Sequence, residues 1–270
     1  MREARVAEVL EEVAELVGLG TFGSRGLGTS GTQAPVAAFD GDGTLWSGDV
    51  GEDFFHAFVR EGDFRALATT ALVHVARAHG LEVADPTDGA PVARQLFEAY
   101  EAGTFHDASI CELIAWAPAG RNWAEYRAFF ETRFPPAMIK SRLHEETVAL
   151  VEGVRRLGVE VFLVSASPKP VVESAAAAAG IPADHVLAAT PRVDASGMVQ
   201  PSVNRPIPYG AGKVARLSER IGERPLVLAC GDNAFDEQLL RHARIGCAVR
   251  PKPRLAAIAD RIEGLRLLRP

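Results

Sequence analysis

The sequence is poor in cysteine, has no surplus of basic residues and contains no long apolar run. Its three cysteines are far apart and form no CxxC pair, so neither a disulfide framework nor a thiolate zinc site is indicated. This cysteine content fits a reducing, cytoplasmic setting. The 29 lysines and arginines are outnumbered by 35 acidic residues, which gives a net charge of −6. An acidic chain repels phosphate backbones, so we expect no general nucleic-acid binding.

The most apolar stretches, at residues 159–164 and 226–230, have only the length of strands. A bilayer span needs about 20 consecutive apolar residues, so we expect no membrane partner. Charged residues interrupt the apolar ones throughout residues 1–19, which argues against a signal peptide. The overall composition, with 47% hydrophobic and 24% charged residues among 270, is that of an ordinary folded protein. This length suits one large domain or two modest ones.

The first 32 residues are predicted to form a helix followed by a linker. Apolar residues at helical spacing over residues 3–18 indicate an amphipathic helix. Residues 18–32 are rich in glycine, serine and threonine, which favours a loop. A Gly-x-Gly-x-x-Gly pattern lies at residues 26–31, but a dinucleotide fingerprint requires a strand before it and a helix after it. We therefore interpret this segment as a flexible link.

Strands and helices alternate along much of the remaining chain. The predicted strands are 35–39, 159–164, 185–189, 226–230 and 245–249, the predicted helices are 145–157, 169–179, 211–221, 234–243 and 255–263, and residues 192–203 are typical of a β-hairpin. Such alternation predicts an α/β fold in which helices cover both faces of a parallel sheet. The helix at 255–263 is expected to be the last element.

Residues 47–144 interrupt this alternation. They show helical spacing, as in Phe54, Phe55 and Phe58, and contain no convincing buried strand. We therefore expect a helical cap at 47–144, inserted after the first strand of a core that comprises residues 33–46 and 145–270.

The sharpest chemical signal is a pair of carboxylates, Asp40 and Asp42, directly after the apolar run 35–39. In open α/β sheets, binding sites form at the carboxyl ends of the strands. Two close carboxylates repel each other unless they share a cation or a proton. Oxygen ligands of this kind suit Mg²⁺.

Other polar groups occupy equivalent places in the chain. Ser165 follows the strand at 159–164, Lys213 enters a helix, and Asp232 and Asp236 follow the strand at 226–230. Singly, these are the residues of turns, helix caps or solvated surfaces. Together, a cation site, a hydroxyl and a lysine at one sheet edge describe a pocket for a phosphate group.

These motifs resemble those of phosphatases in the haloacid dehalogenase (HAD) superfamily, most of all the phosphoserine phosphatase-like branch. Residues 40–44 match the DxDGT motif, Ser165 the second motif, Lys213 the third, and residues 231–236 the fourth motif, GDxxxD. The match covers about residues 35–250, including the cap. The resemblance implies a Rossmann-like (HAD) core. Ala166 and Ser167 stand where the branch often has glycines.

The resemblance also implies roles for these residues. Asp40 would be the nucleophile that forms an aspartyl-phosphate, and Asp42 the general acid and base. Asp40, the backbone carbonyl of Asp42 and Asp232 would hold Mg²⁺, while Asp236 would orient the water shell of the metal or Lys213. Ser165 and Lys213 would neutralise phosphoryl oxygens. The dehalogenases lack the second carboxylate, so Asp42 favours phosphate-ester chemistry.

Two cap residues are candidates for substrate specificity. Asp49 stands where phosphoserine phosphatases have a glutamate that helps to bind the substrate amine. The shorter side chain changes the reach by one methylene, and Glu52 lies on the same helical face. An acidic residue at a helix N-terminus is also favoured by the helix dipole alone.

We therefore predict a Mg²⁺-dependent phosphomonoester hydrolase that acts on a small phosphorylated metabolite. Two alternatives stay open on the sequence: a phosphomutase or phosphotransferase of the same superfamily, and a non-catalytic module that binds a phosphate ligand. The substrate and the oligomeric state are not fixed by the sequence.

Overall fold

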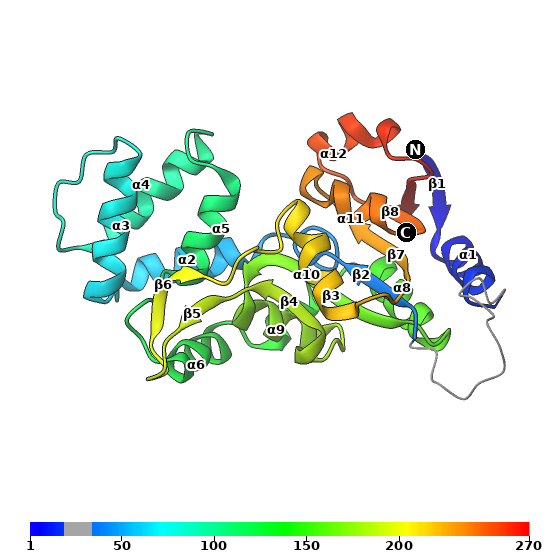
Figure 1. Cartoon of the computed structure of the whole chain (residues 1–270), viewed down its shortest axis with the longest axis horizontal. Helices are drawn as coiled ribbons and strands as arrows, with labels where there is room; N and C mark the ends of the chain where they lie inside the picture. Colours follow the sequence, from blue (N-terminus) through cyan, green and yellow to red (C-terminus); the bar gives the residue numbers. More distant parts are fainter. Residues whose placement is uncertain (19–33, 270) are drawn as a thin grey trace.

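A seven-stranded parallel sheet forms the centre of the protein, with strands in the order β1-β9-β8-β7-β2-β3-β4 (Figure 1). The computed structural model describes residues 1–18 and 34–269. The strands are β1 (Arg2–Arg5), β2 (Val36–Phe39), β3 (Glu160–Pro168), β4 (Val186–Ala189), β7 (Leu226–Gly231), β8 (Ile245–Val249) and β9 (Arg266–Arg269). This sheet confirms the predicted α/β fold.

Helices cover both faces of the sheet, and alternate residues of its strands face the two layers. Ala37 and Phe39 of β2 pack in the apolar cluster that includes α1 (Val6–Gly18), α8 (Glu145–Arg156) and α9 (Lys169–Ala178). Val36 and Ala38 pack in the cluster that includes α10 (Ala211–Ile221), α11 (Glu237–His242) and α12 (Pro253–Ile258). Both faces of the strand are therefore buried, as a parallel sheet requires.

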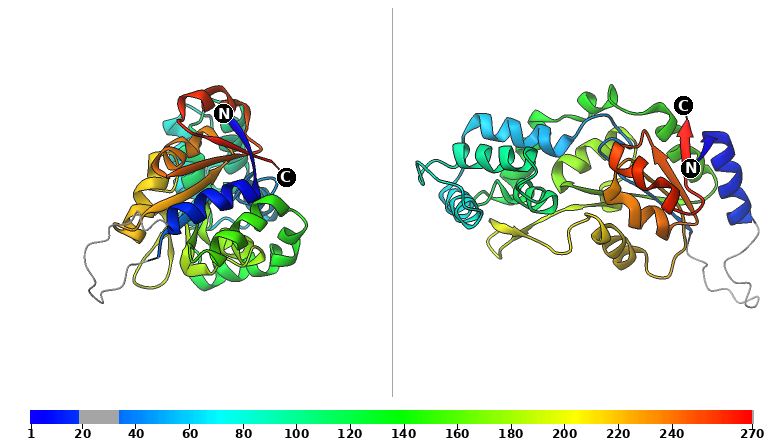
Figure 2. Two further views of the ribbon diagram at one scale, coloured as in Figure 1. Left: turned by 90° about the vertical axis from the view of Figure 1, so that its right-hand side faces the viewer. Right: turned by 90° about the horizontal axis from the view of Figure 1, so that it is seen from above.

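Six helices lie between β2 and α8 in the chain. They are α2 (Val50–Glu61), α3 (Ala66–Ala78), α4 (Gly89–Glu101), α5 (Asp107–Trp116), α6 (Trp123–Arg133) and α7 (Pro136–Lys140). Figure 2 shows most of them at the end of the molecule away from the two termini. The predicted hairpin is present as β5 (Pro191–Val193) and β6 (Val199–Val203), and it packs on α5. We propose that the helices of residues 47–144 form the cap and that this hairpin supports it.

The predictions for the two ends of the chain were partly wrong. The helix predicted at 3–18 begins only at Val6, because residues 2–5 form the edge strand β1. The six helices were expected after the first strand, but they follow the second strand of the chain, β2, because β1 precedes it. The helix predicted at 255–263 is α12 followed by a 3-10 turn, and β9 comes after it and pairs with β1. Residues 19–32 of the predicted linker lie outside the described residues.

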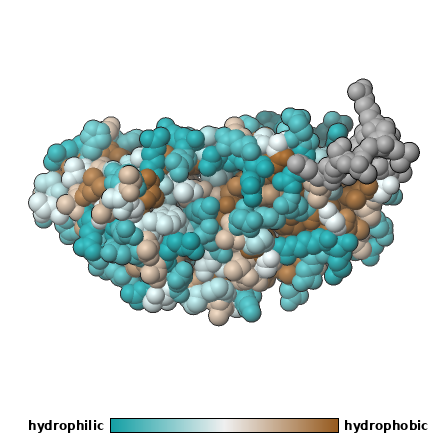
Figure 3. Space-filling model, turned by 60° about the horizontal axis from the view of Figure 1, so that its bottom comes forward, coloured by the Kyte–Doolittle hydropathy of each residue, from teal (hydrophilic) through white to brown (hydrophobic). Residues whose placement is uncertain are grey.

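Hydrophilic residues cover most of the face that Figure 3 shows, with apolar residues visible between them. In the described part of the chain, no helix combines the length and apolar character that a membrane span requires.

Candidate active site

The eight predicted site residues line one pocket. They are Asp40, Asp42, Asp49, Glu52, Ser165, Lys213, Asp232 and Asp236. The sheet contributes the carboxyl ends of β2, β3 and β7, and the helices α2, α4 and α5 contribute the opposite wall. Residues that are far apart in the sequence thus meet at one sheet edge, as the strand-end argument predicts.

The loop after β2 is held by backbone contacts that leave its carboxylates in the pocket. The amide of Asp40 donates to the carbonyl of Cys230 on β7 at 2.9 Å. Gly43 has a φ of +81°, and a Cβ at this position would lie 2.1 Å from Oδ2 of Asp232. Only glycine therefore suits this turn, because both its backbone angle and its neighbour exclude a side chain.

Lys213 joins two of the predicted carboxylates. Its Nζ donates to Oδ1 of Asp40 at 2.6 Å and to Oδ1 of Asp236 at 2.5 Å, and all three side chains are buried. Burial lowers the pKa of Lys213, but the carboxylates of Asp236 and Asp40 outweigh it and raise the pKa overall. Burial raises the pKa of Asp40 well above its usual value, although Lys213 opposes the shift. The lysine therefore stays charged beside the predicted nucleophile.

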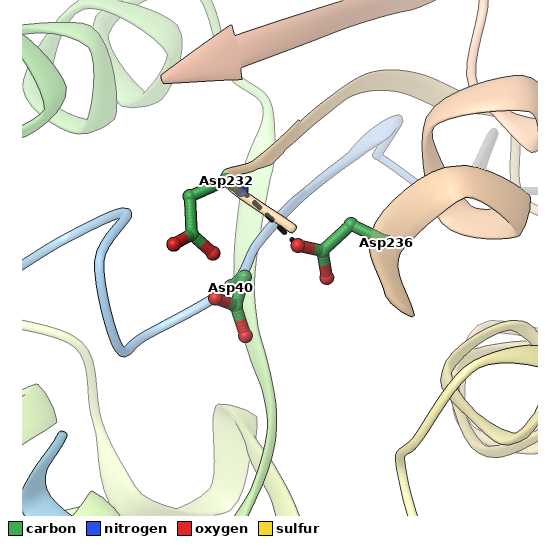
Figure 4. A group of neighbouring side chains, drawn as sticks. All are labelled: Asp40, Asp232 and Asp236. Atoms are coloured by element: carbon green, nitrogen blue, oxygen red, sulfur yellow. Dashed lines mark hydrogen bonds between the residues drawn. The ribbon is translucent and has the colours of Figure 1, made fainter. Parts of the chain in front are cut away.

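The loop after β7 brings two further carboxylates to Asp40. Oδ2 of Asp236 accepts hydrogen bonds from the amides of Asp232 and Asn233 at 3.1 and 3.0 Å, which fixes the turn. Nζ of Lys252 lies 3.0 Å from Oδ2 of Asp232, and this ion pair lowers the pKa of Asp232. Burial outweighs the ion pair and raises the pKa to about 6. Figure 4 shows Asp40, Asp232 and Asp236 grouped together. One carboxylate oxygen from each residue lies within 4.8 Å of those of the other two.

This donor set fits a hard divalent cation. Within the described residues, the three buried carboxylates form ion pairs with two lysines, Lys213 and Lys252, so negative charge is in excess before Asp42 is counted. Asp236 accepts three N–H donors on its two oxygens, whereas Oδ2 of Asp40 accepts a long hydrogen bond of 3.3 Å from the hydroxyl of Thr44 and Asp232 pairs with Lys252 through Oδ2. Asp40 and Asp232 are therefore the better direct ligands. The carboxylate of Asp42 is not in this group.

The side chain of Asp42 instead accepts three hydrogen bonds. Oδ1 accepts from the indole Nε1 of Trp46 at 2.8 Å and from the amide of Val50 at 2.7 Å. Oδ2 accepts from Oγ of Ser167 at 2.7 Å. Ser167 also donates its amide to Oγ of Ser165 at 3.1 Å. The predicted acid, the predicted phosphate-binding serine and the start of α2 are therefore linked.

The two predicted specificity residues lie on the helical wall. Asp49 is the N-cap of α2, where its Oδ1 accepts from the amide of Glu52 at 2.9 Å, and it also lines the pocket. Glu52 accepts a hydrogen bond from the hydroxyl of Tyr100 at 3.4 Å. Burial raises the pKa of Asp49 and of Glu52. Asp49 therefore both caps α2 and lines the pocket.

The pocket also contains polar residues that the sequence argument did not select. They include Tyr100, Asp107, Ser167, Tyr209 and Lys252. Lys252 follows β8, so the strand-end argument would have found it. Ser167 lies at the end of β3, where the same argument applies as for Ser165. Tyr100 and Asp107 had no comparable signal, because they reach the pocket from α4 and α5, whose packing the sequence does not reveal.

Comparison with known proteins identifies the family of this chain. No curated protein matches the chain significantly. Among solved structures, a protein of unknown function from Bordetella pertussis Tohama I is 22% identical, with a TM-score of 0.62 over 87% of this chain and 99% of that chain. A functionally unknown protein from Anaerococcus prevotii DSM 20548 is 15% identical, with a TM-score of 0.65 over 96% and 90% of the two chains.

A phosphoserine phosphohydrolase-like protein from Francisella tularensis subsp. tularensis SCHU S4 is 14% identical, with a TM-score of 0.51 over 86% of this chain and 94% of that one. At these identities the solved structures show a shared fold. The sequence model of the haloacid dehalogenase-like hydrolases matches residues 37–241, which include most of β2, the helices α2–α8 and the loop after β7. The chain therefore belongs to the haloacid dehalogenase-like hydrolase family.

Proposed function

We propose that this hydrolase is a Mg²⁺-dependent phosphatase that cleaves a small phosphate monoester through an aspartyl-phosphate on Asp40. The observation that carries the proposal is the joint position of Asp40 and Asp42 in one pocket, with Asp40 beside Lys213 and Asp232. A nucleophile, a separate proton donor and a positive charge for the phosphoryl group are what phosphate-ester cleavage requires.

The proposed reaction has two displacement steps at phosphorus. In the first, a carboxylate oxygen of Asp40 bonds to phosphorus, the bond to the ester oxygen breaks, and Asp42 gives that oxygen a proton. In the second, Asp42 takes a proton from water while the water oxygen bonds to phosphorus and Asp40 leaves. Ser165 and Lys213 stabilise the phosphoryl oxygens in both steps. Bound Mg²⁺, held by Asp40, Asp232 and the carbonyl of Asp42, would supply further positive charge.

A screen of phosphorylated metabolites for free phosphate tests this function. We expect release that requires Mg²⁺ and stops when the metal is removed by chelation. Ca²⁺ is expected to bind without supporting turnover, because it takes more ligands at longer distances and tolerates bidentate carboxylates. Full activity after exhaustive chelation, with no metal found in the protein, would contradict the metal requirement. Transfer of the phosphoryl group to another hydroxyl without free phosphate would contradict hydrolysis.

We propose that Asp49 and Glu52 select an ester whose alcohol carries an amine or a quaternary ammonium group. The core residues grip only the phosphate, so discrimination must come from the helical wall. That wall carries the carboxylates of Asp49, Glu52 and Asp107, whereas the lysines that line the pocket contact Asp40, Asp232 and Asp236 at its opposite side. Tyr100 and Tyr209 add aromatic faces, which attract cations.

Replacing Asp49 with asparagine is expected to lower kcat/KM selectively for cationic esters. Asparagine caps helices as well as aspartate does, so α2 keeps its N-cap while the pocket loses the carboxylate with which a cationic ester would pair. We expect a loss of roughly 5- to 150-fold on phosphoethanolamine and phosphocholine, corresponding to about 1–3 kcal/mol. Glycerol phosphate is the neutral control and is expected to change little. Equal losses on all esters would make Asp49 a structural residue, and a wild type without preference for cationic esters would refute the substrate class.

A further inference from the structure

Ser167 lies between two residues of the proposed mechanism. It is buried in β3, two positions after Ser165, and lines the pocket. Its hydroxyl donates to Oδ2 of Asp42 at 2.7 Å, and its amide donates to Oγ of Ser165 at 3.1 Å. The side chain thus reaches across from the sheet to the carboxylate that the mechanism uses as acid and base.

The three partners of Asp42 differ in what they can do when its carboxylate takes up a proton. Trp46 and Val50 present N–H groups to Oδ1, and an N–H group of this kind can only donate. A proton on Oδ1 would therefore face two donors. Ser167 presents a hydroxyl to Oδ2, and a hydroxyl can rotate and act as donor or acceptor. Oδ2 is consequently the oxygen that can carry a proton without a donor opposing it.

The first turn of α2 packs closely against this hydroxyl. A Cβ on Gly51 would lie 2.7 Å from Oγ of Ser167 and 3.1 Å from its Cβ. The glycine leaves the space in which Ser167 reaches Asp42, and the amide of Val50, from the same turn, holds the other oxygen. The orientation of the Asp42 carboxylate is therefore fixed from both sides.

We propose that Ser167 is a positioning residue that makes Oδ2 of Asp42 the oxygen through which the proton is transferred. The inference rests on the proposed phosphatase function. While Asp42 is ionised, the Ser167 hydroxyl donates to Oδ2. When Oδ2 is protonated, the hydroxyl rotates away, and the acid proton passes to the ester oxygen as its bond to phosphorus breaks. The hydroxyl then donates to the ionised Oδ2 again, until Oδ2 takes a proton from the attacking water.

The test compares two esters that differ in their need for a proton donor. An alkyl ester such as glycerol phosphate needs protonation of its leaving oxygen, whereas p-nitrophenyl phosphate releases a stable phenolate. The parameter kcat/KM reports only the steps up to departure of the alcohol, so the later water step does not obscure the comparison. For Ser167→Ala we expect kcat/KM to fall about 10- to 100-fold on glycerol phosphate and less than about threefold on the aryl ester.

Two further variants separate the hydroxyl from packing. Ser167→Cys keeps a side chain of similar shape with only a weak donor, so it is expected to show the same selective loss as the alanine variant. Ser174→Ala removes another serine hydroxyl, which donates to the carbonyl of Phe134 at 2.7 Å outside the pocket, and is expected to leave both esters unaffected.

Parallel losses on both esters, no loss on either, or full recovery in Ser167→Cys would overturn the role of Ser167 in an otherwise active phosphatase. A wild type that releases no phosphate from any ester would instead refute the proposed function, and this inference with it.

Discussion

Asp40→Asn is expected to abolish phosphate release and to leave the fold intact. The amide is nearly isosteric with the carboxylate, and its oxygen can still accept the hydrogen bond that Lys213 donates at 2.6 Å. It lacks the anionic oxygen that must attack phosphorus. We expect a loss on the order of 10⁴-fold or more in kcat, as for the removal of other catalytic nucleophiles.

Phosphate release and circular dichroism measured side by side check this prediction. An unchanged spectrum with a lost activity is the expected pair of results. If the folded variant keeps activity within about tenfold of wild type, Asp40 is not the nucleophile.

Lys213→Met is expected to lower both activity and stability. The lysine is only 4% exposed and neutralises Asp40 and Asp236, so methionine leaves two buried carboxylates without their cation. Breaking a buried ion pair from one side typically costs about 3–5 kcal/mol. Lys252→Met is the comparison variant, because Lys252 is 51% exposed and pairs with a single carboxylate, that of Asp232. Its loss is expected to cost less than the loss of Lys213, because a half-exposed lysine is removed from one buried carboxylate and not a buried lysine from two.

The stability deficit of Lys213→Met should depend on pH in a defined direction. Burial already raises the pKa of Asp40, and Lys213 opposes that shift, so removing the lysine raises the pKa further. A carboxyl whose pKa is higher in the folded than in the unfolded protein binds more protons when folded, and its contribution to stability falls as the pH rises. The difference in free energy of unfolding between wild type and variant should therefore be larger at about pH 8 than at about pH 5. A deficit that is equal at both values would show that Asp40 does not carry the effect.

The sequence predicted the strands that bury both faces and the loops at their carboxyl ends. Apolar runs such as residues 226–230 can be recognised as strands in the sequence, because a strand of a parallel sheet is buried on both faces. Asp40, Ser165 and Asp232 follow such runs directly, and strand ends meet at one edge, so their assembly follows from topology alone. Lys213 lies at the start of a helix at the same edge of the sheet.

The strands β1 and β9 were missed for a physical reason. Of the four residues of β1, only Ala4 is buried, and the strand is held by backbone pairing with β9 at the other end of the chain. Arg2, Glu3 and Arg5 look like the charged face of the helix that follows. Pairing between distant segments leaves no local pattern of apolar residues, so periodicity extended the helix into the strand.

The hydrogen bonds between polar side chains inside the pocket were also not predicted from the sequence. Ser167 looked like a departure from a glycine-rich pattern, and its bond to Asp42 depends on the exact approach of β3 to the loop after β2. Tyr100 reaches Glu52 only because α4 packs beside α2. The contact of Tyr100 depends on how two helices pack, and Tyr100 does not follow a buried strand in the sequence.

A phosphorylated Asp40 is the central claim, and Asp42→Asn offers the most direct measurement of it. The asparagine cannot take a proton from water, so hydrolysis of the acyl phosphate should slow by about 10²- to 10⁴-fold, while an aryl ester still phosphorylates the enzyme without a proton donor. We predict that p-nitrophenyl phosphate gives a burst of about one equivalent of nitrophenolate per enzyme molecule, and that mass spectrometry of the quenched protein finds the phosphoryl group on Asp40. Steady nitrophenolate release without a burst, or a phosphoryl group on any other residue, would contradict the account.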